Sequence, residues 1–149
     1  MKKNRYLEMK TVNQSLYHIV IASNGARRFL TRVNQDILFN YITGMLFNRS
    51  CKPIKVGGHS EHVHILLSIA PHIPLLQLIK EIQQNSLDFL RRENSVFPEF
   101  TGWDSNYVAY SHHISQVDEL STMIKNQYEI HRSISFEEEL EILLTKKTT

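Results

Sequence analysis

Cysteine is almost absent from this 149-residue sequence: Cys51 stands alone, so no internal disulfide can form. No apolar run approaches the ~20 residues that a membrane-spanning helix needs. Residues 1–10 carry charge but lack the apolar segment of a secretion signal. These absences predict a protein of the reducing cytoplasm that has no membrane partner.

Neither sign of charge dominates, because 17 lysines and arginines face 15 acidic residues, for a net charge of +2. This excludes a histone-like electrostatic grip on nucleic acid but leaves room for a local basic groove. Five glycines and four prolines form no linker, and the sequence has no repeat or low-complexity tract. Residues 1–149 are therefore predicted to form one domain.

Hydrophobic periodicity predicts the order strand, helix, strand, strand, helix, strand, helix, helix. The strands are expected at 16–22, 53–58, 59–70 and 106–113, and the helices at 31–48, 75–93, 115–131 and 135–144. The first six elements give the β-α-β-β-α-β order. This predicts an α+β fold, a ferredoxin-like antiparallel sheet with two helices on one face and extra C-terminal helices.

The stretch EHVHILL (61–67) carries the clearest chemical signal. On a strand, His62 and His64 project to one face, while Val63, Ile65 and Leu67 face the other way into a core. Two neighbouring imidazoles can bind one metal ion. They can equally be two polar side chains on a solvated surface, and the stretch alone leaves both interpretations open.

A metal site would need a further ligand from elsewhere in the chain. Gln127 shares a helix face with Met123 at spacing i, i+4, and its amide oxygen can bind a hard cation. Most helical glutamines are simply exposed. Gly57 and Gly58, expected in the turn before the histidines, would leave room for a ligand's backbone.

Three segments together are specific: GGHSEHVHILLSI, WDSNYVAYSHHISQVDEL and IKNQYEIHRSISFEEELEILL. Over nearly the whole chain the sequence resembles the HUH single-tyrosine transposases of the insertion-sequence 200/605 type and the related REP-associated enzymes. The resemblance implies metal-dependent cleavage and transfer of single-stranded hairpin DNA in DNA transposition, by a homodimer. It also implies that Mg²⁺ or Mn²⁺ is bound by His62, His64 and Gln127.

The family's nucleophilic tyrosine lies four residues before that glutamine, where this sequence has Met123. A thioether forms no stable phosphoester, so cleavage through position 123 is expected to be impaired. Tyr128, five residues later, would be turned ~140° away and is a poor substitute without a bulge or register shift. The enzymatic activity therefore stays open.

Two other functions remain open at this point. The protein could be a non-catalytic, domesticated nucleic-acid-binding protein, or a metal-dependent hydrolase that uses activated water. In either case basic and aromatic side chains are expected to contact DNA, the basic ones at the phosphates and the tyrosine by stacking on a base, unless it packs in the core. These candidates are Arg27, Arg28, Lys55, Arg91, Arg92 and Tyr107.

Overall fold

The computed structural model describes Met9 and residues 15–148. The expectation that residues 1–10 carry no secretion signal falls, except at Met9, outside the described residues. Within the described part, no helix combines the length and the apolar character needed to cross a bilayer.

Four antiparallel strands form a sheet in the order β2-β3-β1-β4. The strands are β1 (Leu16–Ser23), β2 (Lys52–His59), β3 (His62–Ser68) and β4 (Trp103–His112). Helix α1 (Gln35–Asn48) joins β1 to β2, and α2 (Leu75–Arg92) joins β3 to β4. The predicted ferredoxin-like α+β fold is thereby confirmed.

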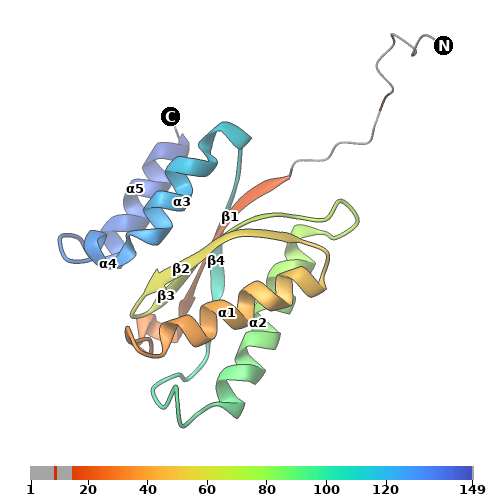
Figure 1. Ribbon diagram of the computed structural model, residues 1–149. Helices are drawn as coiled ribbons and strands as arrows, with labels where there is room; N and C mark the ends of the chain where they lie inside the picture. The colour runs from red at the N-terminus through yellow and green to blue at the C-terminus, as the bar shows by residue number, and fades with distance from the viewer. Residues whose placement is uncertain (1–8, 10–14, 149) are drawn as a thin grey trace.

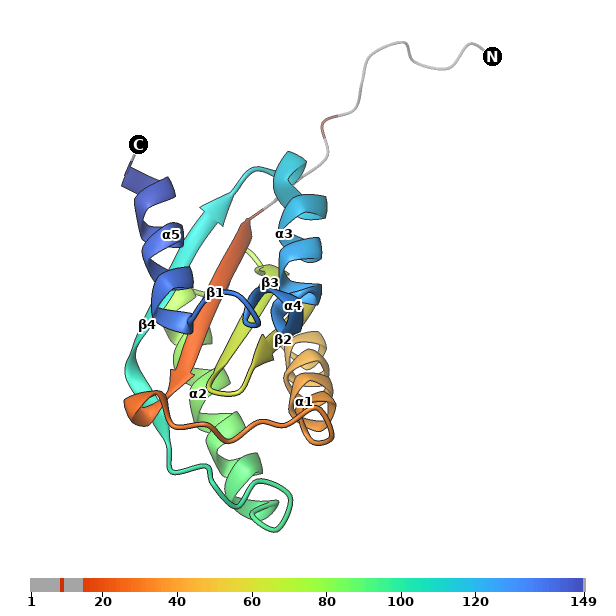
Figure 2. The same cartoon turned by 90° about the vertical axis from the view of Figure 1, so that its left-hand side faces the viewer.

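Helices cover both faces of this sheet (Figures 1 and 2). Helices α1 and α2 lie on one face. The C-terminal helices α3 (Val117–Lys125), α4 (Gln127–Ile130) and α5 (Phe136–Thr148) lie on the other. Two short 3-10 turns, η1 (Asn24–Ala26) and η2 (Ile114–Gln116), follow β1 and β4.

The main hydrophobic core lies between the sheet and helices α1 and α2. Val63, Ile65 and Leu67 are fully buried in it, as the alternation of β3 predicts, and Ile19 and Ile21 of β1 join them. Since every second residue of a strand shares a face, the intervening residues of β1 and β3 point toward α3–α5.

The glycines of β2 differ from the prediction. Gly57 and Gly58 lie inside β2, and the turn to β3 is made by Ser60 and Glu61. A Cβ at Gly57 would lie only 2.8 Å from both Cγ2 and the carbonyl oxygen of Ile124 in α3. The space at Gly57 is therefore filled by a helix of the same chain rather than kept for a ligand.

Two predicted helices also need correction. The helix expected from residue 31 begins at Gln35, because the side chains of Thr31 and Asn34 accept hydrogen bonds from each other's backbone N–H groups and form a preceding turn. The helix expected over 115–131 is divided at Asn126 into α3 and α4. The division matters because the next residue, Gln127, lies in the candidate site.

Candidate metal centre

Strand β3 places the two predicted histidines under the C-terminal helices. His62 and His64 lie opposite Ala22 and Val20 of β1, and their ring centroids are 5.0 Å apart. Both side chains are 0% exposed. The two imidazoles therefore share a face as predicted, and that face is buried rather than solvated.

Gln127 reaches the same point from α4. Its Nε2 donates a hydrogen bond to Glu139 Oε2 at 2.6 Å. A carboxylate oxygen accepts, which fixes the orientation of the amide. Gln127 Oε1 then lies 2.8 Å from His62 Nε2 and 2.9 Å from His131 Nε2. The structure thus brings His62, His64 and Gln127 together.

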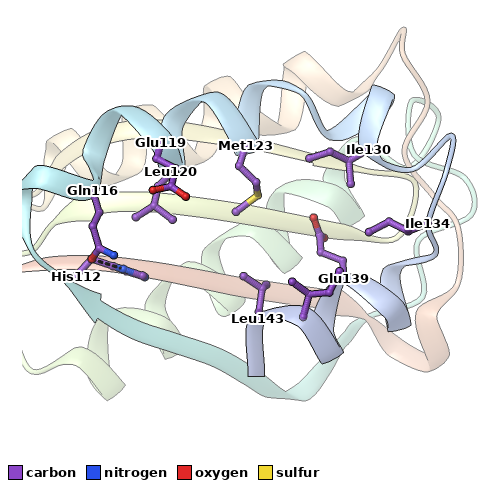
Figure 3. Close-up of a pocket in the computed structure, with 10 residues that line it drawn as sticks. His112, Gln116, Glu119, Leu120, Met123, Ile130, Ile134, Glu139 and Leu143 are labelled. Atoms are coloured by element: carbon purple, nitrogen blue, oxygen red, sulfur yellow. Dashed lines mark hydrogen bonds between the residues drawn. The ribbon is translucent and has the colours of Figure 1, made fainter. Parts of the chain in front are cut away.

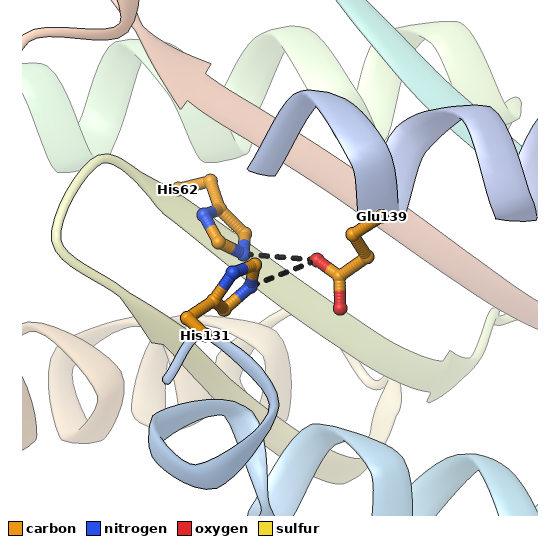
Figure 4. Close-up of side chains that lie close together, drawn as sticks. All are labelled: His62, His131 and Glu139. Carbon is orange, nitrogen blue, oxygen red and sulfur yellow. Dashed lines mark hydrogen bonds and ion pairs between the residues drawn. The ribbon is translucent and has the colours of Figure 1, made fainter. Parts of the chain in front are cut away.

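Two further residues in the cluster were not predicted from the sequence. Glu139 of α5 places Oε1 3.3 Å from His62 Nε2, 3.0 Å from His64 Nε2 and 3.2 Å from His131 Nε2. Figure 4 shows the His62 and His131 rings turned toward this carboxylate. The ligand atoms of His62, His131 and Glu139 all lie within 4.8 Å of one another, so these residues could hold a metal ion.

Local sequence signals for both residues do exist. His131 follows Gln127 by four residues, and its N–H donates to the carbonyl oxygen of Gln127 at 3.0 Å, so the two share a helical face. Ser135 and Glu138 form a reciprocal cap at the start of α5, which occupies the Glu138 side chain. The next residue, Glu139, turns toward the sheet and is 5% exposed.

Each imidazole is also held by its second nitrogen. His62 Nδ1 lies 2.7 Å from Glu61 Oε1, His131 Nδ1 lies 3.0 Å from the carbonyl oxygen of Ile134, and His64 Nδ1 lies 2.7 Å from His18 Nε2. Partners of this kind fix the orientation of metal-binding histidines in proteins.

The electrostatics of the cluster favour an ionised carboxylate. Burial alone would raise the pKa of Glu139, but hydrogen bonds from His131, His62 and His64 outweigh it and hold that pKa far below its ordinary value. Burial likewise opposes protonation of His62, yet hydrogen bonds to Glu139 and Glu61 raise its pKa. For His64 burial dominates and lowers the pKa.

Met123 lies at the edge of the cluster, one turn before Gln127. Gln127 Nε2 is 3.5 Å from the carbonyl oxygen of Met123 and 3.4 Å from its sulfur. Tyr128 lies elsewhere: it is 40% exposed, and the Arg32 guanidinium is 3.7 Å from its ring centroid. The expected divergence of Tyr128 from the face of Met123 and Gln127 agrees with this geometry.

A cavity of about 430 Å³ adjoins the cluster between α3 and α5. Met123 and Glu139 belong both to its wall and to the surroundings of the imidazoles (Figure 3). The rest of the lining is mostly aliphatic, with a polar end near η2. These residues are Leu120, Ile130, Ile134, Ile142 and Leu143, and at the polar end His112, Gln116 and Glu119.

The predicted DNA-contacting residues lie on several parts of the surface. Arg28, Arg91 and Arg92 are exposed, and Arg27 pairs with Glu99. Half-buried Lys55 lies on β2 and Tyr107, 39% exposed, on β4, at opposite edges of the sheet. The structure does not gather these residues around the imidazoles, and their role in DNA binding stays a prediction.

The comparison with protein families identifies the chain. The family model for transposases of the IS200-like type matches residues 11–127. The protein belongs to the IS200-like transposase family. The match ends at Gln127, so His131, Glu139 and helix α5 lie beyond it.

Two solved structures share the fold of this IS200-like transposase. One is a Deinococcus radiodurans protein provisionally designated a transposase, with 22% identity and a TM-score of 0.60 over 85% of this chain and 98% of that one. The other is a REP-associated tyrosine transposase bound to a REP hairpin, with 12% identity and a TM-score of 0.61 over 90% and 76% of the two chains. A search of curated proteins finds no significant match.

Proposed function

We propose that this IS200-like transposase binds single-stranded DNA folded into a hairpin, next to a divalent-cation site formed around His62, His64 and Gln127. Its cleavage of that DNA is impaired at the nucleophile. The observation that carries the proposal is the convergence of these three side chains beside Met123.

Family membership supports the kind of substrate. A structural relative, the REP-associated tyrosine transposase, is bound to a REP hairpin. A bound divalent cation would supply Lewis-acid stabilisation of charge on the phosphate oxygens. The donor set fits such an ion, because imidazole nitrogen and amide and carboxylate oxygen are common metal ligands.

Met123 supports the impairment. Its side chain lies where the resemblance expects the tyrosine, in contact with Gln127 at the edge of the cluster. A thioether cannot carry a phosphoryl group as a stable ester, so no covalent protein–DNA link forms at this residue. Binding of the strand needs no such link and is retained.

The cavity beside the cluster supports a place for a nucleotide. About 430 Å³ lies within the usual range of small-ligand pockets, and aliphatic walls suit the faces of a base. The polar end, with Gln116 and Glu119, offers hydrogen-bonding groups to a base edge. We place the nucleotide that adjoins the bound phosphate in this cavity.

The cavity can be tested with two neighbouring leucines of α5. Leu143→Trp fills it and is expected to weaken binding of a fluorescent hairpin oligonucleotide at least tenfold in anisotropy titrations. Leu144→Trp is the control, because Leu144 is 49% exposed and absent from the lining. Equal affinities for the two variants would remove the nucleotide from this cavity.

The impairment has its own test. The protein as it stands, incubated with hairpin DNA and Mn²⁺, is expected to give no covalent adduct on a denaturing gel, whereas Met123→Tyr gives one. Tyr128→Phe should change neither result. An adduct from the unaltered protein would contradict the impairment, and one that disappears in Tyr128→Phe would locate the nucleophile there.

A second function, non-catalytic DNA binding without a cation, competes with this one. The observation that favours it is Glu139, whose carboxylate already neutralises the imidazole cluster from within the chain. Hairpin affinity that survives both chelation and His62→Ala with His64→Ala would establish it.

The expected homodimer and single HUH domain belong to the same proposal. The cluster assembles within one chain, from β3, α4, the turn after it and α5. A partner is therefore not needed to complete it, and light scattering over a range of concentrations decides the oligomeric state.

A further inference from the structure

We infer that His62, His131 and Glu139, together with the amide oxygen of Gln127, bind a divalent transition-metal ion of the zinc type in preference to Mg²⁺. The inference deepens the proposed function and rests on it only in taking the cluster as a cation site. It differs from the expected set by adding two ligands, His131 and Glu139.

The hydrogen-bond partners of the two imidazoles fix their tautomers. The carbonyl oxygen of Ile134 can only accept, so His131 Nδ1 carries the hydrogen of that 3.0 Å contact. The carboxylate of Glu61 accepts in the same way from His62 Nδ1 at 2.7 Å. In each neutral ring the other nitrogen, Nε2, then presents a lone pair.

Those lone pairs face oxygen atoms that also lack hydrogen. Glu139 Oε1 lies 3.3 Å from His62 Nε2 and 3.2 Å from His131 Nε2. Gln127 Oε1, whose amide nitrogen is engaged with Glu139 Oε2, lies 2.8 and 2.9 Å from the same two nitrogens. Four electron-rich atoms therefore converge at a buried point, and such an arrangement requires positive charge between them.

Protons alone are a poor source of that charge. Both rings would have to be doubly protonated, although their centroids are only 4.9 Å apart and their side chains are 0% and 4% exposed. Two imidazolium ions buried side by side repel each other and lose their hydration. One divalent ion neutralises the carboxylate and satisfies all four lone pairs.

The donor types and their spacing select the ion. Ligands ~2.0–2.1 Å from a tetrahedral ion lie ~3.3 Å from one another, close to the separations around Glu139 Oε1. Two imidazoles with one carboxylate suit zinc, iron or cobalt, whereas Mg²⁺ prefers oxygen ligands and keeps several waters. The partners Glu61 and Ile134 supply the outer hydrogen bonds typical of zinc-bound histidines.

His64 is left out of the inferred ligand set. Its Nε2 lies 3.0 Å from Glu139 Oε1, but its Nδ1 partner is His18 Nε2, which can either donate or accept. His64 can therefore donate to Glu139 and position that carboxylate rather than bind the ion.

The test uses the full chain, stripped with a chelator and titrated with Co²⁺ while its visible absorption is recorded. We expect intense ligand-field bands at one Co²⁺ per chain. Equimolar Zn²⁺ should abolish them, and a large excess of Mg²⁺ should leave them unchanged. A protein that gives no such bands, or loses them to Mg²⁺, would overturn the inference without any variant having to fold.

Two variants assign the ligands. Glu139→Gln keeps the shape of the side chain and His131→Ala removes a ring, and each should weaken Co²⁺ binding at least ~10-fold, since even outer-shell partners cost that much. The matched controls are Glu137→Gln, in the same turn of α5, and His72→Ala, both exposed. Unchanged affinity in Glu139→Gln would remove the carboxylate from the ligand set and overturn the inference.

Hairpin binding, measured on the same samples, separates this inference from the proposed function. Co²⁺ and Zn²⁺ binding without affinity for the hairpin would leave the metal site standing and contradict the proposed function. Hairpin binding that responds to Mg²⁺ alone would do the reverse.

Discussion

The two faces of the sheet come from the same strands and differ in almost every property. Toward α1 and α2, Ile19, Val63 and Ile65 belong to a continuous apolar core. Toward α3–α5, the same strands present His62 and His64, and the buried apolar cluster there is limited to Leu16, Leu66 and Ile124 with a few partly buried neighbours.

This difference separates what stabilises the protein from what it can bind. Apolar burial on the α1–α2 face supplies most of the hydrophobic stabilisation. The α3–α5 layer is held over the sheet by the small cluster and by polar contacts such as those of Gln127 and Glu139. Changes on the first face should therefore alter folding, and changes on the second should alter cation binding.

The largest expected effect is on the apolar face. Ile65→Ala leaves a cavity in a fully buried position and should lower the free energy of unfolding by about 2–5 kcal/mol, as measured by urea denaturation. Its Co²⁺ affinity under folding conditions should equal that of the unaltered protein. A folded Ile65→Ala protein that no longer binds the ion would break the separation of the faces.

A smaller effect is expected at the contact between β2 and α3. Gly57→Ala forces its new methyl group against Ile124 and should cost roughly 1–3 kcal/mol while displacing α3 and weakening cation binding through Gln127. Gly44→Ala in α1 is the control, because its added Cβ meets nothing within 4 Å. That change should stabilise the helix by roughly 0.5–1 kcal/mol. Similar behaviour of the two variants would contradict the close approach of α3.

Acidification should affect the polar face first. The ion needs neutral imidazoles, and hydrogen bonds to Glu139 and Glu61 overcome burial to raise the pKa of His62, so protons compete with the ion above the ordinary value of 6.5. Calorimetric titrations should show affinity falling as the pH falls, by up to about tenfold per unit for each proton displaced. Affinity independent of pH between 8 and about 6 would exclude His62 as a ligand.

The metal-free protein should respond with a defined sign to Glu139. Its folded pKa is lowered because hydrogen bonds from His131, His62 and His64 outweigh burial, so its contribution to stability is present above the ordinary value of 4.5. That contribution is lost as the pH falls below 4.5. Glu139→Gln should flatten this part of the stability profile, and an unaltered profile would show that the carboxylate gains nothing from the imidazoles.

The smallest effect is expected at the surface. Arg27→Ala removes an ion pair with Glu99 whose side chains are 52% and 59% exposed, and should cost less than about 1 kcal/mol of unfolding free energy. If Arg27 contacts phosphate, hairpin affinity will fall and its dependence on salt will become less steep. No change in either quantity would remove Arg27 from the DNA-binding residues.

The apolar face was predictable from the sequence because its information is local. The alternation of Val63, Ile65 and Leu67 defined one face of β3, and helical periodicity located α2 to within a residue. The same alternation placed His62 and His64 together, although it could not say which layer would cover them.

The polar face was predicted only in part because its ligands come from separate elements. Helical spacing alone links Gln127 to His131, but nothing local shows that α5 folds back over β3. Among three consecutive glutamates only the cap formed by Ser135 and Glu138 distinguishes Glu139. The space at Gly57 was assigned to a ligand because the packing partner, Ile124, lies 67 positions further along the chain.

The most direct test of the central claim, that the α3–α5 face holds a transition-metal ion, is a crystal structure of the Zn²⁺-loaded protein with anomalous data at the zinc edge. The account predicts one strong anomalous peak ~2.0–2.2 Å from His62 Nε2, His131 Nε2 and Glu139 Oε1. Intact imidazoles and carboxylate with no peak between them, or zinc bound only elsewhere, would contradict it.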